Sequence, residues 1–334
     1  TVILEALSDA VDYLKSGMPT EFICKINEVL RFALTESLRR RAEYIARLQD
    51  QIDDAEQAEI EQYVSLENEM IGMMVAVIKS CAHNAKGSYI EDFHKQLFPL
   101  FSEFLAEKAS PPLQTSGICC MCDVIESLPR HPINQQYAKQ FITLTMQRSN
   151  HASVDVKQSA VYGVGVCAEA LTNAGFAPYC RDALNVLSTV ITKGDFKDEG
   201  APVRDNAISS VAKIAEVMGG DVARSVLPRW LQWLPCVDDP MEAKVVHRKF
   251  CQFLEAKGDQ GNNPLYGENL RNLPKIFSII CRVLPDTDLR EDATKEHMIN
   301  IIKYLAQNLG AQRMRGVLQQ LDAEEQKVIQ SVLS

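Results

Sequence analysis

Apolar residues recur at three- and four-residue spacing along most of the chain, while strand-like alternation is nearly absent. One segment shows this spacing clearly, with apolar or small residues at Val203, Ala207, Ile208, Val211, Ile214, Ala215 and Met218. Such spacing gathers the apolar side chains on one face of a helix. The pattern predicts an all-α protein whose helices are separated by short clusters of glycine and proline.

Four of the predicted helices can be aligned with one another. They start at Leu66, Leu113, Val156 and Val203, in steps of 47, 43 and 47 residues, and another amphipathic helix lies between consecutive copies. A helix pair that recurs about every 40 to 47 residues has the period of HEAT and armadillo repeats. Each pair has an apolar face that only its neighbours can cover, so the pairs are expected to stack.

The repeat predicts one HEAT-repeat solenoid of the armadillo-like kind over residues 1–334. A long first helix is expected over 21–49. The repeats are expected at 20–87, 88–131, 132–175, 176–220, 221–257 and 264–310, followed by a C-terminal cap at 311–334.

Charge and composition narrow the possible partners. The formal net charge is -9 at pH 7, and a surface of this sign repels phosphate backbones and attracts basic proteins. Direct nucleic-acid binding is therefore not expected, and no apolar run reaches the roughly 18 residues of a membrane-spanning helix. The ten cysteines lie inside apolar helical patterns, which is typical of reduced thiols in the cytosol or nucleus. Because the chain opens at Thr1 within a helical pattern, we expect it to be part of a longer protein.

No motif in the sequence indicates catalysis, a cofactor or a metal. Cys119 and Cys122 have C-x-x-C spacing without a second pair at zinc-finger distance, so buried packing is the better interpretation. Gly163 and Gly165 lack the preceding strand and the third glycine of a dinucleotide site, which favours close helix packing. The histidines form no catalytic pattern, and no phosphate-binding loop occurs.

Three motif blocks are more specific than the repeat period. They are VYGVGVCAEA at 161–170, VLPRWLQWLP at 226–235 and NLPKIFSII at 272–280. Together with the acidic segment at 50–61 and the terminal LDAEEQKVIQSVLS, they resemble the last third of the importin-five (importin beta-three) branch of the importin-beta, or karyopherin-beta, family.

This resemblance implies a right-handed α-α superhelix whose second helices line the inner surface, in a nuclear transport receptor without catalytic activity. Such receptors bind basic cargo such as ribosomal proteins and histones, contact phenylalanine-glycine nucleoporins, and pass through the nuclear pore between cytoplasm and nucleus. The GTPase Ran releases their cargo, mainly through N-terminal repeats that the resemblance places outside this chain. The alternative is a HEAT-repeat scaffold or regulatory subunit that positions an enzyme.

Aligning the repeats places Lys79, Glu126, Glu169 and Glu216 at equivalent positions on successive second helices, with Asp123 adjoining them. Neighbouring helices pack about 10 Å apart, so the fields of the glutamates would overlap and favour a segment rich in lysine and arginine. We expect Asp123, Glu126, Glu169 and Glu216, the acidic column, to bind basic cargo. The alternative is a solvated helix face that keeps the solenoid soluble.

A second acidic candidate is the segment 50–61, which has six acidic residues and no lysine or arginine. Asp53, Asp54 and Glu56 are the residues in it that we expect to contact basic cargo. A charge run of this kind is also typical of a solvated helix end or loop.

Two further patterns have a structural interpretation. Gln114, Lys157 and Arg204 occupy the position where HEAT repeats often carry a base that bridges to an acid of the next repeat. Trp230 and Trp233 lie three residues apart on a predicted helix, so they are expected to share a face and pack in the core.

Overall fold

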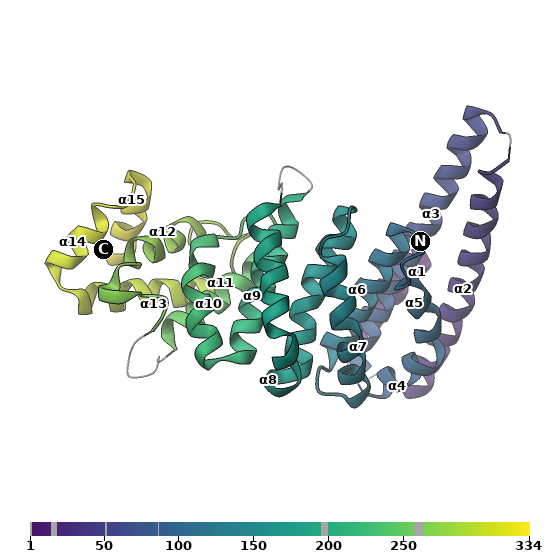
Figure 1. Cartoon of the computed structure of the whole chain (residues 1–334), viewed down its shortest axis with the longest axis horizontal. Helices are drawn as coiled ribbons and strands as arrows, with labels where there is room; N and C mark the ends of the chain where they lie inside the picture. Colours follow the sequence, from purple (N-terminus) through teal and green to yellow (C-terminus); the bar gives the residue numbers. More distant parts are fainter. Residues whose placement is uncertain (1, 15–18, 51, 86, 195–199, 257–262) are drawn as a thin grey trace. The chain divides into compact units, whose positions relative to one another are not determined.

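The structure is a computed structural model of the chain, and every regular element in its described part is helical (Figure 1). It describes residues 2–14, 19–50, 52–85, 87–194, 200–256 and 263–334. The predicted all-α HEAT-repeat fold is confirmed. The helices form two compact units, residues 1–171 and residues 172–334.

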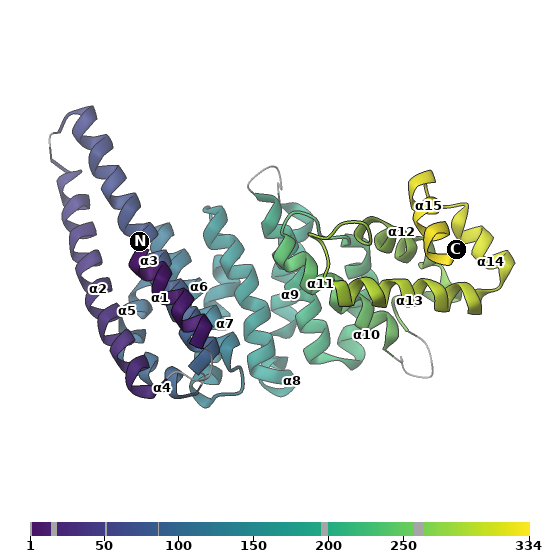
Figure 2. The same cartoon turned by 180° about the vertical axis from the view of Figure 1, so that it is seen from behind.

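The first unit is built from helices that pack in two layers. Its elements are α1 (Val2–Leu14), α2 (Thr20–Arg47), α3 (Asp54–Ala85), α4 (Gly87–Gln96), α5 (Phe98–Phe104), α6 (Pro111–Ser127), α7 (Pro132–Arg148) and the first part of α8 (Val154–Lys193). Among the first helices of the pairs, α2 packs against α4 and α4 packs against α7, while α3 packs between α1 and α6 on the second-helix side (Figure 2). Each pair thus covers the apolar face of the next.

Two helix boundaries in this unit differ from the sequence prediction or refine it. The amphipathic helix expected between the repeats that start at Leu66 and Leu113 is two helices, α4 and α5, because Pro99 has no N–H to donate and its ring cannot fit inside a continuing helix. In α8, Thr172 has non-helical backbone angles (φ 64°, ψ 177°), so this segment is two helices that meet at the end of the first unit.

Close helix packing in the first unit depends on Gly163. A Cβ atom at this position would lie 2.8 Å from Cγ2 of Thr145 on α7 and 3.2 Å from Sγ of Cys122 on α6. These neighbours leave no room for a side chain. The packing interpretation of this glycine is confirmed, and so is that of Cys122, which is itself buried.

The second unit continues the arrangement of helix pairs. Its elements are the remainder of α8, then α9 (Ala201–Met218), α10 (Gly220–Trp233), α11 (Pro240–Glu255), the 3-10 turn η4 (Glu268–Leu270), α12 (Leu273–Val283), α13 (Asp292–Leu309), α14 (Ala311–Leu318) and α15 (Ala323–Leu333). The second helices α9, α11 and α13 pack in sequence, while α10 packs against α9 and α12. The last two helices cover α12 and α13, and a capping box between Asp322 and Glu325 fixes the start of α15. Residue 257, where the fifth repeat was expected to end, lies outside the described residues.

The two tryptophans of α10 have different environments. Trp230 is fully buried, donates its indole N–H to the carbonyl of Ile208 at 3.0 Å, and packs edge-on against Phe253. Trp233, by contrast, is only partly buried, and the Arg229 guanidinium lies over its ring. The core prediction is therefore confirmed for Trp230 alone. Trp233 is the last residue of α10, where fewer neighbouring side chains cover the ring.

Arg204 forms a weak ion pair with the neighbouring Asp205, at 3.9 Å between the guanidinium and Oδ1. Arg204 also donates to the carbonyl of Trp233 at 2.9 Å, where the last carbonyls of α10 have no partner within their own helix. The neighbouring Asp205 provides the acidic contact, since its buried carboxylate accepts the backbone N–H groups of Asp238 and Asp239. Gln114, in the equivalent position of the first unit, likewise donates to a carbonyl, that of Ala109.

A buried histidine links two second helices of the second unit. His247 on α11 donates from Nδ1 to the carbonyl of Leu289, which precedes α13, at 2.8 Å. The ring is completely buried, and this burial lowers the pKa of His247 to about 4. The folded protein therefore holds this histidine neutral at neutral and mildly acidic pH.

We predict that Gly163→Ala lowers the free energy of unfolding by about 1–3 kcal/mol, because the added methyl group overlaps Thr145 and Cys122. Gly72→Ala is the matched control, since nothing lies within 4 Å of that position on α3. The control substitution should leave stability unchanged or raise it by up to about 1 kcal/mol. Urea unfolding measures both, and equal stability of the two variants would contradict the packing at Gly163.

We also predict an acid-sensitive stability that depends on His247. In the unfolded chain His247 takes up a proton below its ordinary pKa of about 6.5, whereas in the folded protein it does so only near its lowered pKa of about 4. Stability is therefore full above this window and falls through it, by up to about 1.4 kcal/mol per pH unit from this group. Thermal melts of the wild type and His247→Asn across this pH range measure the difference in slope. A slope that is identical in both proteins would show that His247 is not the titrating group.

Candidate functional site

The candidate site lies on the second helices, where the acidic column was predicted. In the first unit, Lys79 lies on α3, Asp123 and Glu126 lie on α6, and Glu169 lies on the first part of α8. In the second unit, Glu216 lies on α9. Each is placed by a helix whose opposite face is buried in the core, so its backbone is held firmly.

Asp123 is paired with a lysine of the neighbouring helix. Its Oδ1 lies 3.2 Å from Nζ of Lys79, and the two side chains are 16% and 58% exposed. Burial raises the pKa of Asp123, and the nearby ammonium offsets this effect only in part. Attraction to the same carboxylate raises the pKa of Lys79. Asp123 therefore contributes mainly to the contact between α3 and α6.

Glu126 makes the corresponding contact one repeat further along. The hydroxyl of Tyr162 on α8 donates to Oε2 of Glu126 at 2.7 Å. Glu126 is partly exposed, so its carboxylate remains accessible from solvent. Close by, Arg130 donates to the backbone carbonyls of Glu169 and Ala170, at 2.6 and 3.1 Å.

Glu216 has the most exposed carboxylate of the paired residues in the column. It forms an ion pair and hydrogen bond with Lys249 on α11, with side chains that are 47% and 9% exposed respectively. Removing a buried ammonium from water is costly unless an acid compensates it. Glu216 therefore supplies a countercharge for Lys249 and joins α9 to α11.

These contacts share a geometry that the aligned column did not reveal. Each joins neighbouring second helices at positions that are not equivalent in the repeat alignment. Glu126, for instance, lies 13 residues after the start of its aligned segment at Leu113, whereas its partner Tyr162 lies only 6 residues after the start of the next segment at Val156. Comparing the same position in each repeat therefore missed Tyr162 and Lys249. The partners could have been found by searching the neighbouring second helix one or two helical turns away from the equivalent position.

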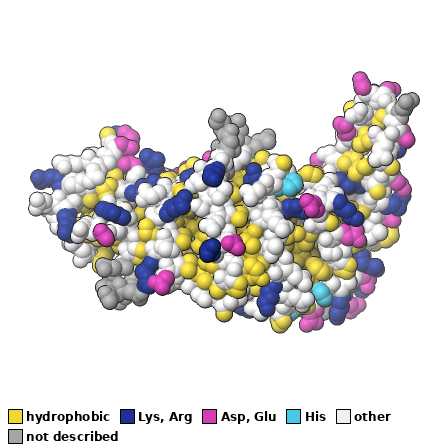
Figure 3. All heavy atoms as spheres, viewed as in Figure 1, with side chains coloured by type: hydrophobic (Ala, Val, Ile, Leu, Met, Phe, Trp, Pro, Cys, Tyr) yellow, Lys and Arg dark blue, Asp and Glu magenta, His cyan; other side chains and the backbone are white. Residues whose placement is uncertain are grey.

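The second acidic candidate lies at the tip of the α2–α3 hairpin, where Figure 3 shows acidic side chains gathered. Asp53 accepts the backbone N–H of Glu56 at 2.8 Å and so caps the start of α3. Glu56 pairs with Arg47 of α2, and Asp54 is exposed at the first position of α3. Acids in the first turn also interact favourably with the helix dipole. The structural role of this segment is thus defined, and its role in cargo binding stays a prediction.

A clamp below the tip fixes the direction of the hairpin. Arg40 donates to both carboxylate oxygens of Glu67, at 2.6 and 3.1 Å, and Ser37 donates to the same carboxylate at 2.6 Å. Burial acts to raise the pKa of Glu67, but the hydrogen bonds from Arg40 and Ser37 lower it further than burial raises it. Above the clamp, the rings of Tyr44 and Tyr63 stack with centroids 5.2 Å apart.

The described part of the chain contains neither a candidate metal site nor a candidate membrane-spanning helix. Its histidine, cysteine and acidic side chains do not form a group of three or more that could hold a metal ion. Burial raises the pKa of Cys120 and Cys122 well above the ordinary thiol value, which keeps both thiols protonated. None of the described helices is both long enough and apolar enough to cross a membrane.

The stacked helix pairs define a HEAT-type α-solenoid. The same fold is found in crystal structures of the karyopherin Kap121p, so the expected karyopherin resemblance is confirmed at the level of the fold. No protein-family model matches the chain.

Three of these structures illustrate the similarity. Kap121p alone matches with a TM-score of 0.72 at 16% identity, over 98% of this chain and 27% of Kap121p. Kap121p bound to RanGTP matches with a TM-score of 0.72 at 15% identity, over 98% and 28% of the two chains. Kap121p bound to the SUMO protease Ulp1p gives the same TM-score of 0.72, identity of 15% and coverage of 98% and 28%. The chain therefore spans little more than a quarter of the length of the Kap121p chains it matches.

We predict that Glu216→Gln lowers stability by about 1 kcal/mol, because it removes the carboxylate that is ion-paired with the largely buried Lys249 ammonium. Glu296→Gln on α13 is the control, since this exposed glutamate has no ion pair among the described residues. Urea midpoints at low salt measure both variants. Equal effects of the two substitutions would show that the Lys249 pair does not stabilise the unit.

Proposed function

We propose that the chain is part of a karyopherin-type nuclear transport receptor whose acidic column binds basic segments of cargo proteins. The observation that carries this proposal is the match of the fold to Kap121p over 98% of the chain. Kap121p has been crystallised with RanGTP and with Ulp1p, which supports a receptor that binds both a GTPase and protein ligands. The proposed location is the cytoplasm and nucleus, with passage through the nuclear pore.

The electrostatics favour a basic ligand. The chain has a net charge of -9, and Glu126, Glu169 and Glu216 are all at least partly accessible on second helices. Because each carboxylate is accessible from solvent and has two acceptor oxygens, a lysine or arginine of a cargo segment can approach it. Each exposed pair contributes only about 0.5 kcal/mol, so recognition of this kind needs several contacts and is sensitive to salt.

Other proposed partners follow from the same fold. Phenylalanine-glycine nucleoporins and Ran are expected to bind the complete receptor, with Ran bound mainly by repeats outside this chain. Ribosomal proteins and histones are the basic cargo classes that the sequence resemblance implies. We propose a binding role without catalysis.

We predict that the combined substitutions Glu126→Gln, Glu169→Gln and Glu216→Gln weaken binding of a lysine- and arginine-rich peptide by about tenfold. Three contacts of about 0.5 kcal/mol each amount to about 1.5 kcal/mol, which is close to a factor of ten. Fluorescence anisotropy with the complete receptor measures the affinity. The control carries Glu103→Gln, Glu107→Gln and Glu296→Gln, which removes the same charge from exposed positions outside the column.

The outcome separates the acidic column from general electrostatics. An equal loss of affinity in the control, or no loss in either variant, would remove the column from the proposed site. A further variant with Asp53→Asn, Asp54→Asn and Glu56→Gln measures the contribution of the hairpin tip in the same assay. Because these substitutions keep side-chain shape, a circular dichroism spectrum is sufficient to check that the helices are intact.

The receptor proposal itself is tested with Ran. A pull-down from cytosol with the complete protein should retain basic cargo, and addition of Ran locked in its GTP form should release it. A stable kinase or phosphatase partner that is indifferent to Ran would instead identify a HEAT-repeat scaffold.

A further inference from the structure

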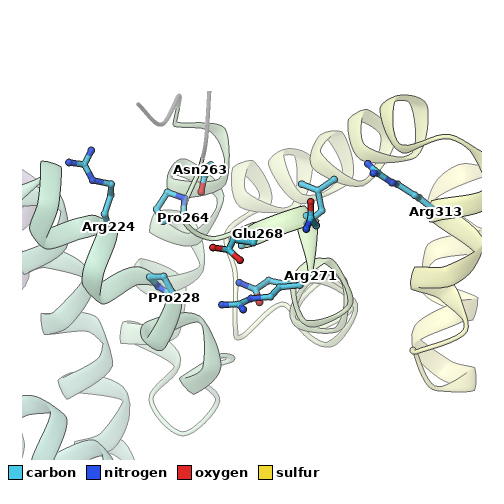
Figure 4. A pocket seen from close by; sticks show the side chains of 11 residues that line it. Arg224, Pro228, Asn263, Pro264, Glu268, Arg271 and Arg313 are labelled. Atoms are coloured by element: carbon cyan, nitrogen blue, oxygen red, sulfur yellow. The ribbon is translucent and has the colours of Figure 1, made fainter. Parts of the chain in front are cut away.

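A basic cavity lies within the second unit of this acidic protein. It has a volume of 750 Å³ and is lined by three arginines, Arg224, Arg271 and Arg313, and by one acid, Glu268 (Figure 4). Arg224 comes from α10, Arg313 from α14, and Arg271 from the segment just before α12. The cavity lining thus has three cationic side chains and one anionic side chain, although the chain as a whole has a net charge of -9.

Two of the three arginines have unused ion-pairing capacity. Arg224 is bonded to Asp221. Within the described part of the chain, by contrast, no acid lies within ion-pairing distance of Arg271 or Arg313. Figure 4 shows Arg271 and Glu268 together on the loop between α11 and α12, with Arg313 approaching from α14. A guanidinium presents paired N–H groups that match both oxygens of a carboxylate.

The loop that forms the floor of the cavity is held in place on both sides. Asn263 donates to the carbonyl of Phe253 at 2.6 Å, and Asn272 donates to the carbonyl of Leu265 at 2.9 Å. Between these anchors, Asn269 and Leu270 have positive φ angles of 54° and 65°. Asparagine adopts this region readily, whereas Leu270 does so at an energetic cost that the surrounding contacts must offset.

An apolar cavity of 440 Å³ adjoins the basic one and shares Arg224, Asn263 and Pro264 with it. Its remaining lining is mainly apolar or small and includes Ala215, Ala223, Leu227, Phe253 and Ala256. Glu216 also lines it, with its carboxylate paired to Lys249. The two cavities thus form one groove, with an apolar end and a basic end.

We propose that this groove binds an acidic linear peptide, with one hydrophobic side chain in the apolar cavity and carboxylates facing Arg271 and Arg313. Both kinds of lining are then used, since the apolar end accepts a side chain and the arginines fix the charged flank. A polynucleotide fits less well, because it has no side chain to place in the apolar cavity beside the arginines. The proposal does not depend on the transport function proposed above.

A peptide-binding assay tests the proposal directly. The probe is a fluorescein-labelled peptide of glutamates around a single leucine, and the comparison peptides replace the glutamates by glutamine or the leucine by serine. We expect saturable binding of the acidic peptide to the whole chain and about a tenfold or greater loss for Arg271→Glu/Arg313→Glu. The matched control is Lys303→Glu/Arg315→Glu, which changes the charge equally at exposed positions outside both cavities and should bind like the wild type.

The remaining arms assign each end of the groove. Loss of affinity on replacing the leucine supports the apolar end, and loss on replacing the glutamates supports the basic end. Absence of saturable binding, or equal binding by the double variant and the wild type, overturns the proposal. An oligonucleotide that loses binding in the double variant while the acidic peptide does not would also overturn it and assign the arginines to nucleic acid. Matching thermal melts of the two variants show that differences in binding do not come from unfolding.

Discussion

The structure depends on one constraint, namely that a single helix pair cannot cover its own apolar face. Neighbouring pairs must therefore approach closely, and Gly163 shows how close, since even one methyl group there would overlap α6 and α7. Stacking of this kind buries a continuous core without a central sheet or a closed bundle. It also brings successive second helices side by side, which determines where polar side chains can meet.

Polar contacts between second helices are a direct result of this stacking. Asp123, Glu126 and Glu216 each contact the next or preceding second helix, through Lys79, Tyr162 and Lys249. These pairs lie at the border between core and solvent, where a charge is partly desolvated but still reachable. A carboxylate in this position can stabilise the stack and remain part of an electrostatic surface, so the structural and ligand-binding roles of the column are compatible.

The sequence could predict the helices and their pairing because both follow from local periodicity and its recurrence. It could not predict the break between α4 and α5 with the same method, because the apolar pattern continues through Pro99 although the backbone cannot. Tyr162 and Lys249 were missed since contacts between repeats join positions that alignment does not equate. Arg224, Arg271 and Arg313 share no spacing at all, and only the fold brings them to one cavity.

The opposite charges of the column and the groove can coexist because each is local. In the second unit, Glu216 lines the apolar end of the groove, yet its charge is offset by Lys249, which is largely buried beside it. The field at the groove is therefore dominated by arginines at the other end, two of which have no acid within ion-pairing distance among the described residues. Fields from acids more than about 8–10 Å away are strongly reduced at physiological salt. A net charge of -9 thus describes the attraction of a basic partner from a distance, while the side chains within one Debye length decide what each surface binds.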